Sequence, residues 1–184
     1  MLRNTEARWG GIAQGFHWLV ALLIVVQGAI GLTMVELGMT PTKVRVYALH
    51  KSIGLTILAL VLLRLSWRAM QRLPRDMPGP AWQRIAARIS HALLYLLMLA
   101  LPLSGWLFNS AANFPLSWFG LVHVPGLTHG YDPALKSLAR AAHEWLFWIL
   151  AGVVAIHITA ALWHHFGRRD DVLRRMLPGG KEAR

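Results

Sequence analysis

Four apolar segments, each as long as a membrane crossing, dominate the sequence. They lie at about residues 16–35, 48–67, 89–110 and 141–166, and a helix needs about 20 mostly apolar residues to cross a bilayer. Because the bilayer core holds no water, each segment must satisfy its backbone hydrogen bonds internally, as a helix does. The sequence therefore predicts an all-α integral membrane protein, a four-helix up-down bundle that forms one domain over residues 1–184.

Prolines mark the connections between these segments. The stretch 36–47 contains Pro41, and the stretch 71–88 is rich in proline and arginine, so we expect no helix to continue through either. Residues 111–139 form the longest predicted loop. Its aromatic stretch 114–122 is typical of a segment at the membrane interface rather than of a span.

The composition agrees with a membrane protein and excludes several cofactor classes. Hydrophobic residues make up 55% of the chain, which is more than globular proteins usually contain. Cysteine is absent, which excludes disulfides, thiolate-bound iron–sulfur clusters and covalent c-type haem. The net charge of +11 is explained by basic segments that orient the protein in the membrane, so we expect no nucleic-acid binding.

Lysine and arginine are distributed unequally between the two sides of the membrane. The N-terminus, the region 64–88 and the tail hold 14 of these residues, and the opposite side holds five. The positive-inside rule therefore predicts that both termini lie in the cytoplasm. Alternating spans then assign His17, His91, His157 and His164 to the inner half, and His50 and His143 to the outer half.

The fourth segment carries histidines inside an apolar run. His143 and His157 are 14 residues apart, so they share one helix face and lie about 21 Å apart along the axis. Ionisable residues inside a membrane span are rare and usually functional. One helix face could thus hold two metal centres, one near each side of the membrane.

A six-coordinate haem b needs two neutral imidazoles from different helices. In the outer half, His50 and His143 are the two histidines within the predicted spans. His123 and His129 belong to the outer loop, where we expect them to be solvated. If a haem is bound in the outer half, its predicted ligands are therefore His50 and His143.

The inner half contains more histidines than one haem requires. His17 and His91 lie at nearly equal depth, so the residues alone leave both open as the partner of His157. Arg64 follows His50 by 14 residues and shares its helix face at the inner level. A haem propionate would suit its guanidinium, and the alternative is an arginine that extends to the membrane interface.

A set of short fragments resembles the bacterial cytochrome b561 family, including its superoxide oxidase-like members. These are four-helix inner-membrane proteins that bind two haems. The resemblance covers essentially the whole chain. The fragments are Phe16-His17-Trp18, Leu49-His50, Ser90-His91, Leu101-Pro102-Leu103-Ser104-Gly105, His143-Glu144, His157 and Ala161-Leu162-Trp163-His164-His165.

The resemblance implies two non-covalent b haems in the core of the bundle. The inner iron would be held by His17 and His157, and the outer iron by His50 and His143. The family pattern thus favours His17 over His91 as the inner ligand. It also implies a bacterial inner-membrane location.

The resemblance further implies a superoxide:ubiquinone oxidoreductase. Superoxide would be oxidised to oxygen at the periplasmic face, and ubiquinone would be reduced near the inner haem. His91 and His164 then become candidates for contacting the quinone, since imidazoles exchange protons near neutral pH.

Several cations lie on the predicted outer side near the outer ligands. A basic surface there would attract a small anion such as superoxide, and the alternative is binding of haem propionates or lipid phosphates. The candidate steering residues are Arg45, Lys51, Lys136 and Arg140.

Two other functions are compatible with the same residues. The first is a quinol-linked electron carrier that exchanges electrons with a periplasmic redox protein. The second is a proton or metal transporter whose path is lined by histidines. The sequence leaves open whether the protein is a monomer or a homodimer in the lipid membrane.

Overall fold

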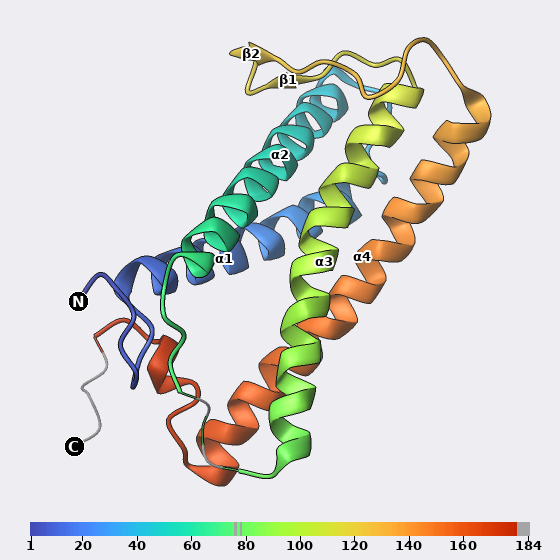
Figure 1. The fold of residues 1–184 in the computed structure, drawn as a ribbon. Coiled ribbons are helices and arrows are strands. Elements are labelled where there is room, and N and C mark those ends of the chain that lie inside the picture. Colours follow the sequence, from blue (N-terminus) through green and yellow to red (C-terminus); the bar gives the residue numbers. More distant parts are fainter. Residues whose placement is uncertain (76, 78, 180–184) are drawn as a thin grey trace.

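The computed structural model describes residues 1–75, 77 and 79–179, and these residues form four long helices (Figure 1). The helices are α1 (Gly11–Met34), α2 (Pro41–Ala69), α3 (Ala81–Ala111) and α4 (Pro133–Leu162). Each is long and apolar enough to cross a membrane. The predicted all-α four-helix membrane bundle is therefore confirmed.

Helices α2 and α4 begin about two turns earlier than the sequence predicts. Pro41 and Pro133 occupy the first helical positions. An N–H group there would have no partner within the helix, so the N–H that proline lacks is not missed, and the fixed backbone angle of proline already suits a helix. Thr40 and Asp132 precede them, and each side chain accepts a hydrogen bond from a backbone N–H of the first turn. The chain therefore breaks its helix before Pro41 as predicted, because α1 ends at Met34 and α2 starts at Pro41. The predicted extents of the connections are wrong: both loops are shorter than expected, and so is the connector 71–88, because α3 already begins at Ala81.

The earlier helix starts place the outer histidines well inside the bundle. His50 is nine residues after Pro41, and His143 is ten residues after Pro133. At 1.5 Å per residue, each lies about 14 Å from the outer end of its helix. Each histidine therefore lies more than two helical turns inside the outer end of its own helix.

The outer loop contains a short antiparallel hairpin of β1 (Ser117–Trp118) and β2 (Val122–His123) (Figure 1). The indole N–H of Trp118 donates to Thr56 Oγ1 at 3.0 Å. The backbone N–H of the next residue donates to Ser52 Oγ at 2.9 Å. The predicted interfacial aromatic stretch is thus a hairpin fastened to α2.

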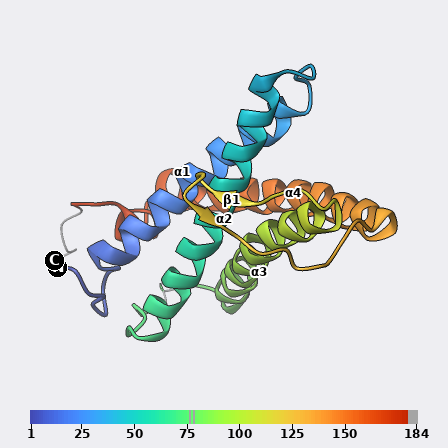
Figure 2. The ribbon, with the colours of Figure 1, turned by 90° about the horizontal axis from the view of Figure 1, so that it is seen from above.

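The buried core lies between the two histidine levels. Viewed from above, α3 and α4 run side by side, and α1 and α2 form a second pair joined at its outer turn (Figure 2). Leu150 is buried on α4, seven residues from both His143 and His157. An apolar layer with members from all four helices therefore separates the inner from the outer histidines. Its buried residues are Val20, Ile57, Val61, Leu97, Met98 and Leu150.

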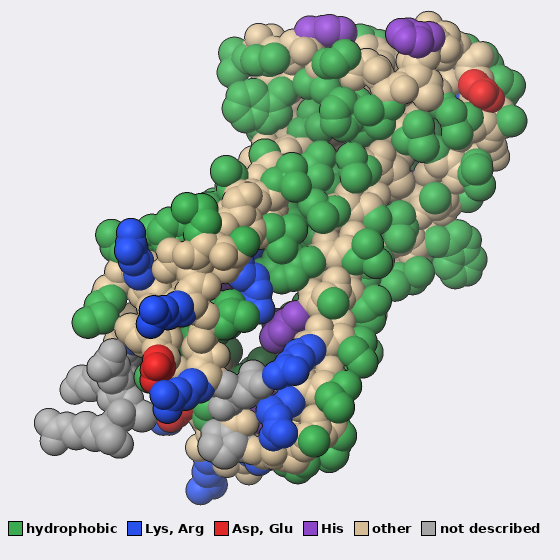
Figure 3. Space-filling model, viewed as in Figure 1, with side chains coloured by type: hydrophobic (Ala, Val, Ile, Leu, Met, Phe, Trp, Pro, Cys, Tyr) green, Lys and Arg blue, Asp and Glu red, His purple; other side chains and the backbone are tan. Residues whose placement is uncertain are grey.

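The N-terminal segment and the C-terminal tail meet at the inner end of α1. The indole N–H of Trp18 donates to the carbonyl oxygen of Met176 at 2.9 Å, and Gln14 Nε2 donates to the carbonyl oxygen of Arg175 at 3.3 Å. Arginine side chains gather at this end, whereas the middle of the same face is mainly apolar (Figure 3). The tail is therefore held against α1 at the basic end of the molecule.

Candidate metal centres and their surroundings

The outer site consists of His50 on α2 and His143 on α4, whose ring centres lie 6.2 Å apart. His143 Nδ1 lies 2.9 Å from the carbonyl oxygen of Leu101 and 3.1 Å from Ser104 Oγ. A ring N–H at Nδ1 can donate to that carbonyl, which leaves Nε2 free to bind a metal. The structure thus brings together the outer pair predicted from the sequence.

Two glycines let these rings approach the neighbouring helices. A Cβ atom on Gly105 of α3 would lie 2.9 Å from His143 Cε1, and one on Gly31 of α1 would lie 3.2 Å from His50 Cε1. Both distances are shorter than an ordinary contact between carbon atoms. Each imidazole therefore occupies space that a larger residue at the glycine would fill.

The inner site contains three histidines rather than two. The ring of His157 on α4 lies 6.2 Å from that of His17 on α1 and 5.6 Å from that of His91 on α3, measured between ring centres. The alternatives left open by their depth in the sequence therefore remain open in the geometry. Both histidines are within reach of His157.

Arg64 on α2 completes the inner site. Its Nη2 lies 3.1 Å from His17 Nδ1, and its guanidinium carbon lies 5.4 Å from the centre of the Tyr95 ring. A guanidinium can only donate, so His17 Nδ1 accepts, and a neutral ring then carries its proton on Nε2. His17 must release Arg64 before Nε2 can bind a metal, which would free the guanidinium for an anionic partner.

The donor sets fit a haem better than a bare metal ion. Within the part of the chain that the structure describes, no group of three or more His, Cys, Asp or Glu residues could hold a metal ion. A haem brings its own equatorial nitrogens and needs only axial protein ligands. Each pair of imidazoles, with ring centres 6.2 Å apart and contributed by two different helices, would supply two such ligands.

Comparison with known proteins agrees with this chemistry. The profile of the family described as prokaryotic cytochrome b561 matches residues 8–179. The chain belongs to the prokaryotic cytochrome b561 family. The resemblance inferred from the sequence is therefore confirmed.

Three relatives match almost the whole of this cytochrome b561 chain. Cytochrome b561 homolog 2 of Escherichia coli (strain K12) is 38% identical over 176 residues, which cover 95% of this chain and 93% of the relative. Cytochrome b561 homolog 1 of the same strain is 32% identical and covers 90% and 94%. The protein named "Probable superoxide oxidase CybB" of Yersinia pestis is 30% identical and covers 89% and 92%.

Membership of this family establishes the general function. The protein is an electron-transfer membrane protein of the oxidoreductase type, and its family implies b-type haem. Its four helices and its family fit the inner membrane of a bacterium. This membership favours electron transfer over the predicted transporter.

Among the four predicted steering residues of this cytochrome, Lys51 is held beneath the outer loop. Its Nζ donates to Asn109 Oδ1 at 3.1 Å and to the carbonyl oxygen of Pro115 at 3.0 Å. Asn109 is buried, and its amide nitrogen in turn donates to the carbonyl oxygen of Phe114. The ammonium of Lys51 therefore connects α2 to the loop close to His50.

The other three steering residues lie nearer the surface. Arg140 forms an exposed ion pair with Glu144 at 2.8 Å, which neutralises much of its charge. Lys136 lies over the ring of Tyr131, 5.4 Å from its centre. Arg45 is exposed on α2. Lys136 and Arg45 are thus the cations of this set that are best placed to act at a distance.

At the inner end, His164 is held by an acidic partner that the sequence did not suggest. His164 lies in the π-helical turn Trp163–Arg168 that extends α4, and its Nδ1 is 2.6 Å from Asp170 Oδ2. The other carboxylate oxygen of Asp170 accepts from the backbone N–H of Val172. Both partners of the pair are about four-fifths buried. The feature of the sequence that could have indicated this partner is the acidic Asp170 within a mostly basic tail.

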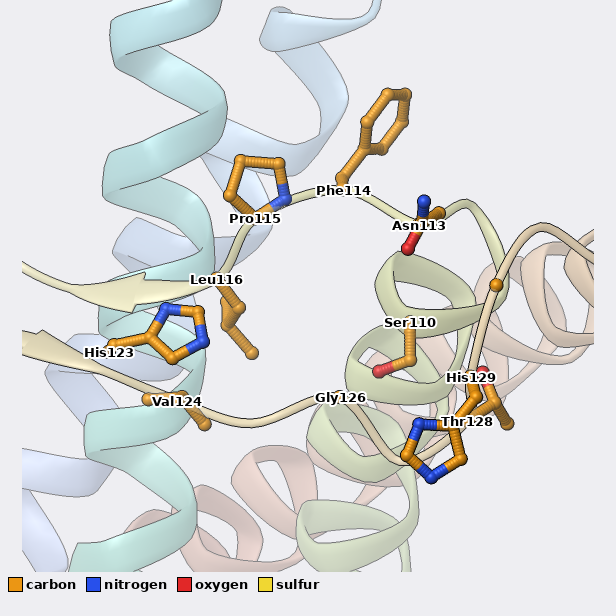
Figure 4. Close-up of a pocket in the computed structure, with 11 residues that line it drawn as sticks. Ser110, Asn113, Phe114, Pro115, Leu116, His123, Val124, Gly126, Thr128 and His129 are labelled. Atoms are coloured by element: carbon orange, nitrogen blue, oxygen red, sulfur yellow. The ribbon is translucent and has the colours of Figure 1, made fainter.

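The outer loop lines an open pocket of about 330 Å³ between the end of α3 and the hairpin. His123 and His129 line it from opposite sides (Figure 4). Both side chains are exposed, as expected for loop histidines. The fold therefore keeps these two imidazoles apart, unlike His50 and His143.

Proposed function

We propose that this cytochrome is a superoxide:ubiquinone oxidoreductase with both termini in the cytoplasm. The observation that carries the proposal is the pair of imidazole-lined sites on opposite sides of one apolar layer. Helix α4 supplies a histidine to each site, so one rigid element links the two. The superoxide substrate is suggested by the name of the Yersinia pestis relative.

In this proposal the chain holds two b haems through four neutral imidazoles. Bound haem supplies one-electron redox chemistry. Leu101 and Ser104 orient the His143 ring, and Arg64, once released from His17, offers a forked donor to a haem propionate. The proposed ligands are His50 and His143 at the outer site and His17 and His157 at the inner site.

The outer surface would collect the substrate. Each superoxide ion gives up one electron there and leaves as oxygen. Arg45 and Lys136 would raise the local concentration of a small anion, and Lys51 would add positive charge beside the outer site. Arg140 contributes less, because Glu144 compensates its charge.

The inner end would deliver protons to the quinone. Ubiquinone takes up two electrons and two protons to become the quinol, so two superoxide ions are consumed for each quinol formed. His91 and His164 are the proposed proton donors to the quinone oxygens. Asp170 accepts the Nδ1–H of His164, which holds the imidazole in one orientation and makes it a better relay.

The purified, detergent-solubilised protein tests this proposal directly. We expect a reduced haemochrome spectrum of two b haems per chain, reduction by superoxide without a partner protein, and reoxidation by a water-soluble ubiquinone analogue. A two-haem protein that is inert to superoxide but is reduced by quinol would instead be an electron carrier for a periplasmic redox protein. A protein without haem would refute both electron-transfer mechanisms.

The superoxide reaction is expected to slow as salt rises, because counterions screen the attraction of the outer cations. Stopped-flow measurement of haem reduction should show a loss of about tenfold between low and high ionic strength. The double variant Arg45→Glu/Lys136→Glu should be slower at low salt and nearly independent of salt. Two charge reversals at the inner end, at the exposed residues Arg3 and Arg72 (Arg3→Glu and Arg72→Glu), serve as the matched control. A rate that does not change with salt would contradict electrostatic steering.

A further inference from the structure

A glutamine in the membrane core touches the outer site, and neither the sequence pattern nor the proposed electron path uses it. Gln27 of α1 donates from Nε2 to the backbone carbonyl oxygen of His50 at 2.7 Å. Its other amide atom, Oε1, is fully buried and has no hydrogen-bond partner among the residues that the structure describes. A buried amide oxygen without a partner is costly in free energy.

His50 has an unsatisfied atom of the complementary kind. Its Nδ1 is fully buried and finds no hydrogen-bond partner within residues 1–75, 77 and 79–179. Gly31 lies one turn after Gln27 on α1, and a Cβ atom there would be 3.7 Å from His50 Nδ1. Residues four apart share a helix face, so Gln27 and Gly31 present one surface to the His50 side chain.

The orientation of the Gln27 amide follows from its contacts. The carbonyl oxygen of His50 can only accept, so the nitrogen of the amide must face it and the oxygen must face away. Gly54 leaves room for this approach, since a Cβ atom there would lie 3.4 Å from Gln27 Nε2. Among the described residues, Gln27 Oε1 is the one buried amide oxygen without a partner.

We propose that Gln27 is the positioning residue of the outer site, its Oε1 accepting a hydrogen bond from the Nδ1–H of His50 when Nε2 binds iron. The inference rests on the proposed haem ligation by His50. A metal-bound imidazole usually donates its second N–H to an acceptor, which fixes its tautomer and raises its basicity. His143 already has such an acceptor in Leu101, and Gln27 gives His50 an equivalent one.

Gln27→Leu is expected to raise the midpoint potential of one haem, whereas Gln27→Glu is not. A more basic ligand stabilises oxidised iron, so removing the acceptor with leucine should raise the midpoint potential. Glutamate keeps an acceptor oxygen and should leave that potential at or below the wild-type value. Both variants lose the neutral amide that donates to the carbonyl of His50, so a merely structural contact would shift both in the same direction.

The experiment is a potentiometric titration of the purified two-haem protein, followed by haem absorption. Thr33→Val is the matched control, because Thr33 is exposed on α1 and its hydroxyl donates to carbonyl oxygens of its own helix; it should change neither potential. Arg64→Ala removes a cation beside the inner site and should lower the other potential. Unchanged potentials in Gln27→Leu, or a shift of the same haem as in Arg64→Ala, would overturn the proposal.

Two further outcomes are also decisive. If Gln27→Leu binds only one haem, Gln27→Glu decides: two haems with a potential at or below wild type support the role, and a raised potential refutes it. If the wild-type protein itself lacks two haems, the proposed function fails. A different result, in which the wild-type protein binds two haems but substitution of Gln27 changes neither potential, would refute only the role of Gln27.

Discussion

Replacing His157 by alanine is expected to reduce the haem content of the purified protein from two per chain to one. His157 faces both His17 and His91, so its loss removes the inner site whichever of them is the partner. The outer pair lies beyond the layer around Leu150 and should keep its haem. The reduced haemochrome spectrum, with the protein quantified independently, measures this ratio.

The same measurement identifies the partner of His157. His17→Ala should also leave one haem per chain, whereas His91→Ala should leave two. The reverse result would assign His91 as the ligand and leave His17 as the partner of Arg64. His123→Ala, in the outer loop, is the control and should leave both haems. Two haems retained in His157→Ala would contradict the inner site as proposed.

The double variant His91→Leu/His164→Leu is expected to lose quinone reduction by about 100-fold, the usual contribution of a general acid or base. Both haems should remain, and superoxide should still reduce them. Stopped-flow mixing of the reduced protein with a ubiquinone analogue measures the affected step alone. A loss of haem from this variant would show that His91 is an iron ligand instead.

Asp170→Asn provides a graded test of the same proton path. It leaves the His164 imidazole in place but weakens the acceptor that orients it, so the loss should be clearly smaller than in the double variant. His129→Leu in the outer loop is the matched histidine control. Full quinone activity in the double variant would exclude both histidines as proton donors.

The four spans could be predicted because the length of a run of apolar residues is read directly from the sequence. A run of about 20 apolar residues must become a helix in lipid, whatever its neighbours are. The helix starts were not predictable in the same way. Pro41 was interpreted as a helix break, although a proline with a capping residue before it begins a helix. Only the backbone geometry distinguishes these two roles.

The two depths at which the histidines lie could also be predicted from the sequence. The 14-residue spacing of His143 and His157 sets one face and two depths on any straight helix, and His50 was the one outer partner within a span. The geometry brings these predicted residues together. The geometry does not choose between His17 and His91, because both lie at the depth of His157 and both rings are close to its ring.

The sequence by itself thus determined the four membrane-spanning helices, the two histidine levels along them and the family. Only the tertiary structure revealed the contacts of Asp170 with His164 and of Gln27 with His50. The physical reason is that helical periodicity is local, whereas these contacts depend on how a tail folds back and how two helices rotate against each other. Such rotations are set by packing, including the space that Gly31 and Gly54 leave.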